Sequence, residues 1–415
     1  MIQIPNTTTL TPRREADGLY LFPFSGTQLV KMDLLFEAGS AYQAKKLAAA
    51  GATKLMPLAT TKMDSAAMSE FMDFRGIIVE TSPDIYQVTE TFYFLDRYAD
   101  ELLPVVGDML RDAALADADF EVWRAGRRQE IAKQMRQPSA VARQKFNEAI
   151  FGPDHPMGRH ATVEDAENIG PEDIRRHYCD FFTSPKIVLA GNINQEMVEG
   201  VVGRILNNRS NRSNQSNQNT PIIQNTPKKI IEAPIDAATQ TSLRIGRVLP
   251  LAWDSMDYAR FMLLTTLLGG YFGSRLMSNL REDKGYTYGI YARTQLRRGC
   301  IVFFITAEVA AGTDRAAIGE VMAEMERLRN EPVTEQELEL VKTVMVGDFL
   351  RSVDGIFERS ARFCDMLDAH IDERLTDNLR EAINTTDAAQ LQELAQRLLK
   401  PEDMTVIAAG AFSRC

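Results

Sequence analysis

The chain has 415 residues, of which 45% are hydrophobic and 25% are charged, and its formal net charge is −10. This length allows two domains that each bury a core, and the composition is typical of a soluble globular protein. The acidic charge and the lack of a long basic run argue against a nucleic-acid partner. No apolar stretch approaches the ~20 residues of a membrane span, and the amino terminus lacks the apolar core of a signal peptide. We therefore expect a cytoplasmic protein, although a removed export signal would leave this same sequence.

The first part of the chain predicts a strand followed by two helices. Residues 28–43 are expected to form a strand that ends in a turn of small residues, and a helix-like segment follows over residues 43–63. Residues 65–76 have apolar side chains at helical spacing and end in Gly76, which suits the carboxyl end of a helix.

A polar run at residues 207–219 divides the chain nearly in half. It consists of Asn, Ser, Gln and Arg, a composition that cannot form a packed core. We therefore predict one domain over residues 1–206, a linker over residues 207–229 and a second domain over residues 230–415. Limited proteolysis is expected to cut first between residues 207 and 228.

The two halves are expected to contain similar elements in similar order. A buried strand is predicted at residues 186–192 and an amphipathic helix at 195–206. After the polar run, a strand at residues 239–249 leads into a helix at 254–268, and the chain ends on a strand at 404–410 that echoes 186–192. Further helices are predicted at residues 313–330, 334–351, 356–370 and 386–399. This order favours an α+β fold in each half and an internal duplication.

The stretch from Gly51 to Leu58 lacks residues that bind metal. A catalytic zinc is held by three His or carboxylate ligands, and two His with a Glu base fit one helix as His-x-x-Glu-His. With that spacing, this stretch has Lys54, Pro57 and Leu58. An ammonium group, a proline ring and an aliphatic side chain cannot hold zinc or activate its water.

A glycine-rich motif in the second half carries candidate functional side chains. Residues 267–288 read LLGGYFGSRLMSNLREDKGYTY. Ser274 is expected to cap a short helix that bears Arg281, and Gly285 permits a turn into a strand. That strand, residues 286–295, is predicted to pair with residues 299–309. Without a function, Arg281 would form a surface ion pair in its charged run and Tyr288 would be a half-buried strand residue.

Together these segments resemble the pitrilysin/insulinase-like peptidases, the M16 family. The resemblance rests on the strand and helices of residues 28–76, the motif at 267–288, and the His-Pro loop at His155 with the helix and strand that follow it. It covers essentially the whole chain. It implies two homologous domains, each an antiparallel sheet backed by helices, which form half of a clamshell.

The same resemblance implies site residues and partners. In the family, a Glu on a later helix is the third zinc ligand, and Glu130 matches it; Lys54, Pro57 and Leu58 stand where the motif ligands and base would be. Arg281 and Tyr288 match an Arg and a Tyr that reach the zinc centre of the opposite clamshell half, where they bind substrate and stabilise the oxyanion. The chain then resembles the non-zinc-binding subunit of a heterodimeric M16B-like endopeptidase that cleaves peptides. It would hold no metal, be inactive alone and depend on zinc in its partner subunit.

Two alternatives belong to other classes. In the first, the chain is an inert M16-like scaffold or peptide-binding protein. In the second, it is a self-sufficient hydrolase, although no Ser-His-Asp or Cys-His motif is evident. A loop metal site at His155 and His160, with His177 on a following helix, is a further alternative. The four cysteines form no Cys-x-x-Cys pair and are expected to be free thiols.

Overall fold

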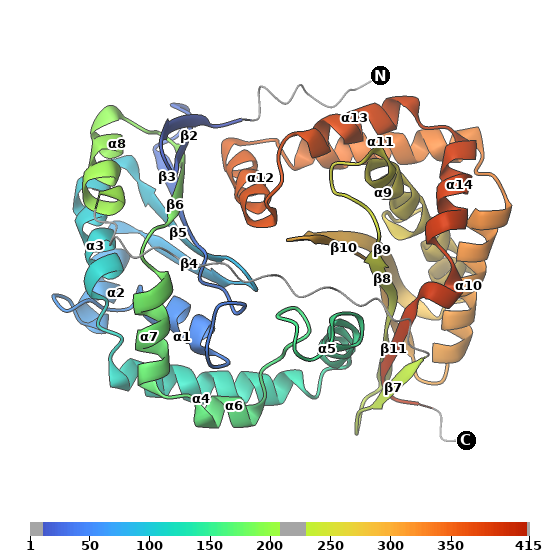
Figure 1. Ribbon diagram of the computed structural model, residues 1–415, viewed down its shortest axis with the longest axis horizontal. Coiled ribbons are helices and arrows are strands. Elements are labelled where there is room, and N and C mark those ends of the chain that lie inside the picture. The colour runs from blue at the N-terminus through green and yellow to red at the C-terminus, as the bar shows by residue number, and fades with distance from the viewer. Residues whose placement is uncertain (1–10, 208–229, 413–415) are drawn as a thin grey trace.

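The computed structural model describes residues 11–207 and 230–412. All of the predicted linker except Asn207 lies outside these ranges, so the domain boundaries and the cleavage site stay predictions. The first half (blue to green) and the second half (yellow to red) lie side by side, each with one sheet and its own set of helices (Figure 1). No helix within the described ranges is long and apolar enough to cross a bilayer.

The first sheet has six strands in the order β1-β2-β6-β3-β5-β4. The strands are β1 Arg13–Ala16, β2 Leu19–Pro23, β3 Leu29–Phe36, β4 Ile78–Pro83, β5 Val88–Leu95 and β6 Lys186–Gly191. All neighbouring strands are antiparallel except β2 and β6, which are parallel. The expected antiparallel sheet is therefore mixed at one pair.

The second sheet repeats this topology with five strands in the order β7-β11-β8-β10-β9. The strands are β7 Ile231–Pro234, β8 Gln240–Leu249, β9 Thr287–Arg297, β10 Cys300–Ala310 and β11 Thr405–Gly410. Here too only one pair, β7 with β11, is parallel. Each strand from β7 to β11 therefore takes the place of its counterpart from β2 to β6, as the predicted duplication requires.

The helices follow the strands in the same order in both halves. The first half has α1 Ala48–Leu55, α2 Ser65–Arg75, η2 Asp96–Tyr98, α3 Ala99–Asp112, α4 Asp117–Gln134, α5 Pro138–Phe151, α6 Val163–Asn168, α7 Pro171–Phe181, α8 Gln195–Val201 and the π-helix η3 Val202–Leu206. The second half has α9 Met256–Gly269, the π-helix η4 Met277–Asp283, α10 Asp314–Asn330, α11 Glu335–Arg351, α12 Ile356–Ala369, α13 Arg374–Thr385, α14 Ala388–Leu398 and η5 Pro401–Asp403. Gly76 ends α2 with φ 62°, as predicted. Helix α13 is absent from the sequence prediction.

Two helices cross between the halves. Helix α5 of the first half packs on β8 and β11 of the second sheet, and α12 of the second half packs on β2, β3 and β6 of the first (Figure 1). Phe146 of α5 is buried with Val302 and Ile407, and Cys364 of α12 is buried with Leu35. Each sheet therefore has one face covered by a helix of the other half, which ties the halves into one body.

Polar contacts reinforce this exchange. Arg298 follows β9 and is nearly buried; its guanidinium donates to Tyr42 Oη at 3.1 Å in the first half and to the Asp368 carbonyl at 2.7 Å in the second. Arg297 also pairs with Asp84 of the first half at 2.8 Å. A buried arginine with several acceptors fixes orientation more than it adds stability, because its desolvation offsets its attraction to them.

Candidate functional site

Helix α1 is shorter than the sequence pattern suggests. It ends at Leu55, since Pro57 has no backbone N–H to continue it. Of the three motif positions, only Lys54 lies in the helix; Pro57 is buried in the following turn and Leu58 is partly exposed there. The expectation that these positions share a helix is therefore wrong for the last two. The same spacing within α1 falls on Gly51, Lys54 and Leu55, which also offer no zinc ligand.

Glu130 lies on α4, which packs against α1. Its carboxylate is exposed and accepts hydrogen bonds from Arg127 Nη1 at 2.6 Å and Gln134 Nε2 at 3.0 Å. Within the described ranges, no group of three or more His, Cys, Asp or Glu side chains is arranged to hold a metal ion. A catalytic zinc needs three protein ligands, so the residues at this position do not fit one.

Glu90 is a buried acid in this region that the sequence pattern did not single out. It lies on β5, its side chain is fully buried, and neither carboxyl oxygen has a hydrogen-bond partner in the described part of the chain. Burial raises its pKa well above the usual value, and the nearby Lys54 ammonium only partly opposes this. The sequence signal that could have located it is the spacing of two residues that puts Glu90 on the same strand face as the apolar Val88 and Phe92.

Two histidines of the first half, His155 and His177, make hydrogen bonds to the backbone. His155 is buried, and its Nδ1 accepts a hydrogen bond from the Met157 backbone N–H at 3.1 Å. His177 is also buried, and its Nε2 donates to the Ala38 carbonyl at 2.7 Å. Burial lowers the pKa of both rings, which favours their neutral forms.

Arg281 and Tyr288 lie on adjacent segments of the second half. Arg281 belongs to η4, and π-helices frequently occur at functional sites. Gly285 adopts φ 65°, and the Tyr286 N–H donates to the Leu280 carbonyl at 2.9 Å, which closes the turn into β9. The predicted pairing of this strand with β10 is confirmed.

Both side chains differ from the expectation for residues without a function. The Arg281 guanidinium lies 4.4 Å from the centre of the Phe272 ring and forms no ion pair with any described residue, whereas Lys284 of the same charged run pairs with Glu320. Tyr288 is 90% exposed rather than half-buried. Exposure of this extent on a strand leaves the phenol free to meet another molecule.

The predicted cap of η4 is wrong in its detail. The Ser274 hydroxyl is buried and has no hydrogen-bond partner among the described residues. The Ser274 carbonyl instead accepts the N–H of Ser278 at 3.0 Å, the first turn of this helix. Close packing matters more here, because a β-carbon on Gly269 would lie 2.6 Å from the Ala292 backbone nitrogen.

The two sets of candidate residues lie in different halves. Helix α1 packs on α4, α7 and β4, whereas η4 packs on β9 and α10. The fold thus brings Lys54 near Glu90 and α1 near the helix of Glu130, and it brings Arg281 near Tyr288. It does not join these two groups into one site.

Comparisons with known proteins point to one peptidase family. Residues 168–345 match the family described as "Peptidase M16 inactive domain". The chain is 21% identical over 69% of its length to "Non-peptidase homolog YmxG" of Helicobacter pylori, of which 67% is covered. It is 20% identical over 55% of its length to "Probable inactive metalloprotease YmfF" of Bacillus subtilis, of which 53% is covered. The match thus spans about half to two thirds of these curated relatives.

A solved structure shows the likeness over nearly the whole fold. The crystal structure of a peptidase M16 inactive domain from Pseudomonas fluorescens superposes with a TM-score of 0.84 at 18% identity, covering 97% of this chain and 98% of that one. At this identity the likeness establishes the fold, two repeated α+β units that correspond to half of a clamshell. Residues 168–345 thus match the M16 inactive-domain family, and the chain has the fold of the solved M16 inactive domain.

Proposed function

We propose that this chain is the non-metal subunit of a heterodimeric zinc endopeptidase and that Arg281 and Tyr288 act on a peptide held at the partner's zinc. One observation carries the proposal: the zinc position has no set of ligands, while Tyr288 is 90% exposed and Arg281 is without an ion pair in the described ranges. We also propose that the complex works in the cytoplasm, as the sequence suggests.

The chemistry assigns a separate role to each side chain. The partner's zinc would supply the activated water that attacks the peptide carbonyl. The Tyr288 hydroxyl would donate a hydrogen bond to the oxyanion that develops there, an interaction that is strongest in the transition state. Arg281 would donate to a backbone carbonyl of the bound peptide, and its stacking on Phe272 would hold the guanidinium in place.

The geometry favours action on another subunit. Helix η4 packs on β9 and α10, while α1 packs on α4, α7 and β4, so Arg281 and Tyr288 lie apart from the degenerate zinc position of the first half. In such a heterodimer, one subunit would hold the zinc and the other would supply the Arg and Tyr, so each would need only part of the site.

An inert scaffold or peptide-binding protein is the second candidate. It is favoured by the missing ligands and by relatives named as a non-peptidase homolog and as a probable inactive metalloprotease. In that case Arg281 and Tyr288 would not affect any turnover.

Metal analysis of the purified chain tests the claim that this chain holds no zinc. Elemental analysis should find no stoichiometric zinc, and the chain alone should cleave no peptide, because Lys54, Pro57 and Leu58 cannot bind the metal. One tightly held zinc per chain that disappears in Glu130→Ala would overturn this assignment.

Co-purification from the native source tests the claim that a zinc-containing partner subunit exists. A tagged chain should bring down a zinc-containing M16-type subunit together with peptidase activity that a chelator abolishes. A chain that purifies alone, or a complex whose activity is untouched by chelation, would favour the scaffold.

A further inference from the structure

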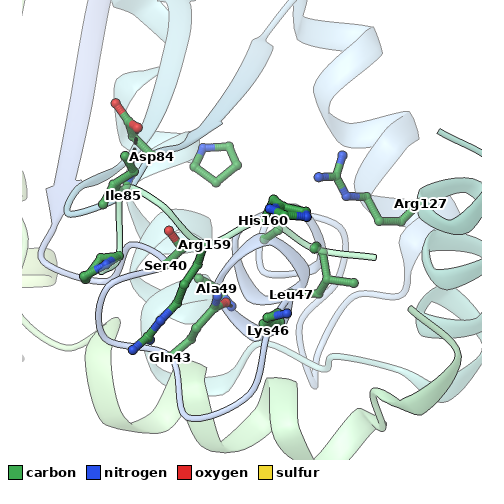
Figure 2. Close-up of a pocket in the computed structure, with 14 residues that line it drawn as sticks. Ser40, Gln43, Lys46, Leu47, Ala49, Asp84, Ile85, Arg127, Arg159 and His160 are labelled. Carbon is green, nitrogen blue, oxygen red and sulfur yellow. Dashed lines mark hydrogen bonds between the residues drawn. The ribbon is translucent and has the colours of Figure 1, made fainter. Parts of the chain in front are cut away.

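A pocket of about 250 Å³ opens in the first half beside the start of α1. Its walls come from the loop before α1, the turn between β4 and β5, helix α4, and the loop between α5 and α6. Figure 2 shows Arg127 reaching from α4 toward His160, with Lys46 and Arg159 on neighbouring loops and Asp84 on the opposite rim. Three cationic side chains and an imidazole thus line it against a single carboxylate.

Part of this hydrogen-bonding capacity is already used. Lys46 pairs with Asp165 at 3.1 Å, and Arg127 Nη1 pairs with Glu130 at 2.6 Å. On the rim, Asp84 is held by Arg297. The local acids therefore neutralise only some of the positive charge.

The remaining groups are unsatisfied. Arg127 Nε and His160 Nδ1 are buried atoms without a hydrogen-bond partner in the described part of the chain. Arg159 also lines the pocket; its side chain is exposed and forms no ion pair with any described residue. Buried polar atoms without partners are rare in native proteins and call for a ligand or ordered water.

The loop that carries two of these groups has a fixed shape. His155 Nδ1 accepts from Met157, and the His155 carbonyl accepts from the N–H groups of Gly158 and Arg159 at 2.9 and 3.0 Å. A β-carbon on Gly158 would lie only 1.9 Å from the Gly152 carbonyl oxygen, so only glycine allows this approach. The turn therefore presents Arg159 and His160 at defined positions before any ligand arrives.

Apolar side chains complete the lining. Leu47, Ala49 and Ile85 line the pocket together with the charged residues. An inorganic anion would leave this apolar surface unused, whereas an organic acid could place an aliphatic body against it. Arginine forks and an imidazole N–H match the two oxygens of a carboxylate.

We propose that this pocket binds the carboxylate of an organic ligand, supplied by an acidic side chain or the carboxyl terminus of a peptide or by a small free dicarboxylate. Arg127 and His160 donate to the carboxylate, and Arg159 and Lys46 add positive charge around it. The choice of a peptide among these sources rests on the proposed function. Binding itself needs only this chain, so it is measured without the partner and its failure leaves the role of Tyr288 open to its own test.

The test uses the full chain and a matched set of ligands. Fluorescence anisotropy would follow a labelled peptide that contains two Glu residues and a free carboxyl terminus, and competition would compare its Glu-to-Gln form, its amidated form, glutarate and inorganic phosphate. Loss of affinity on either peptide change identifies the carboxylate used, and competition by glutarate alone identifies a small-molecule site.

Two substitutions and one control locate the binding site. His160→Gln should weaken carboxylate binding by about tenfold or more, as expected for loss of a hydrogen bond to a charged group, and Arg159→Gln should weaken it by removing a nearby positive charge. Arg128→Gln removes the same charge from the neighbouring position of α4, where Arg128 pairs with Glu167 outside the pocket, and should leave binding unchanged. Circular dichroism and melting temperature check that all three variants fold.

Defined outcomes overturn the proposal. They are no carboxylate-dependent binding of any ligand in the set, competition by phosphate as strong as by the carboxylates, or equal loss of binding in Arg128→Gln and Arg159→Gln.

Discussion

Glu90 lies on β5 on the same face as Val88 and Phe92, inside the hydrophobic core of the first half. Its folded-state pKa is raised well above the ordinary value of 4.5, chiefly by burial. An acid with a raised folded pKa binds its proton more tightly in the folded state than in the unfolded state. Its ionisation therefore costs no stability below about pH 4.5, and the cost grows as the pH rises from there toward the folded pKa.

We predict that Glu90→Gln raises the melting temperature more at pH 8 than at pH 5, because glutamine cannot ionise. Thermal unfolding across this pH range measures the difference between variant and wild type. The exposed Glu130→Gln is the control and should show no such trend. A difference for Glu90→Gln that is the same at both pH values would contradict the raised pKa.

For single residues, the sequence predicted which side chains are candidates better than it predicted their contacts and exposure. The motif around Gly285 located Arg281 and Tyr288, but only the fold shows that one stacks on Phe272 and the other is 90% exposed. No strand was predicted over residues 88–95, so the burial of Glu90 was not expected. Which face of a strand is buried depends on the helices that cover it, and these come from distant parts of the chain.

At the scale of whole elements, Phe146 is a residue through which α5 packs on the second sheet. It is fully buried against the second sheet, and the Arg244 guanidinium lies 5.3 Å from its ring centre. Phe146→Ala should lower the free energy of unfolding by about 3–5 kcal/mol, the usual cost of removing a buried aromatic side chain. The loss should reach both halves, because α5 belongs to the first half by sequence and to the second by packing.

The two tryptophans allow this to be measured. Trp123 lies on α4 of the first half and Trp253 precedes α9 of the second. Urea unfolding followed by fluorescence in Trp123→Phe and Trp253→Phe backgrounds should show the same shift on adding Phe146→Ala. The exposed Val122→Ala should shift neither signal. A shift confined to the Trp123 signal would mean that α5 does not hold the second half.

Several elements were predictable from the sequence, whereas β4, β5, α3, α5 and α13 were not expected, and the packing partners of the helices could not be predicted. Apolar spacing indicated α10, α11, α12 and α14, and each lies close to the expected residues. The same spacing shows which face of a helix is buried but not which sheet covers it, so the crossing of α5 and α12 could not be predicted. The helix-like segment expected over residues 43–63 is shorter in the structure, Ala48–Leu55, because Pro57 cannot continue the helix.

The whole molecule should survive a cut between its halves. If a protease cleaves within residues 207–228, α5 and α12 still cover the sheets of the opposite halves, and Arg298 still bridges Tyr42 and Asp368. The two fragments should elute together from a size-exclusion column and separate only in denaturant. Fragments that elute separately in native buffer would contradict the reciprocal packing.

The repeated topology of the two sheets places Arg281 and Tyr288 in the second half and the ligand-free zinc position in the first. A complex reconstituted with a wild-type zinc subunit provides the decisive comparison. Arg281→Ala should raise KM as well as lower turnover, because its bonds to the peptide backbone would form before the transition state. Tyr291→Phe removes a hydroxyl from the same strand, where Tyr291 is partly exposed, and serves as the control.

The most direct test is the turnover number of Tyr288→Phe in that complex, with assembly checked by size-exclusion chromatography. If Tyr288 donates to the oxyanion, the complex should assemble normally while turnover falls by about 10² to 10³-fold, the usual loss for one such donor. Full turnover in the assembled Tyr288→Phe complex would contradict the proposed role and leave the inert scaffold as the function of this chain.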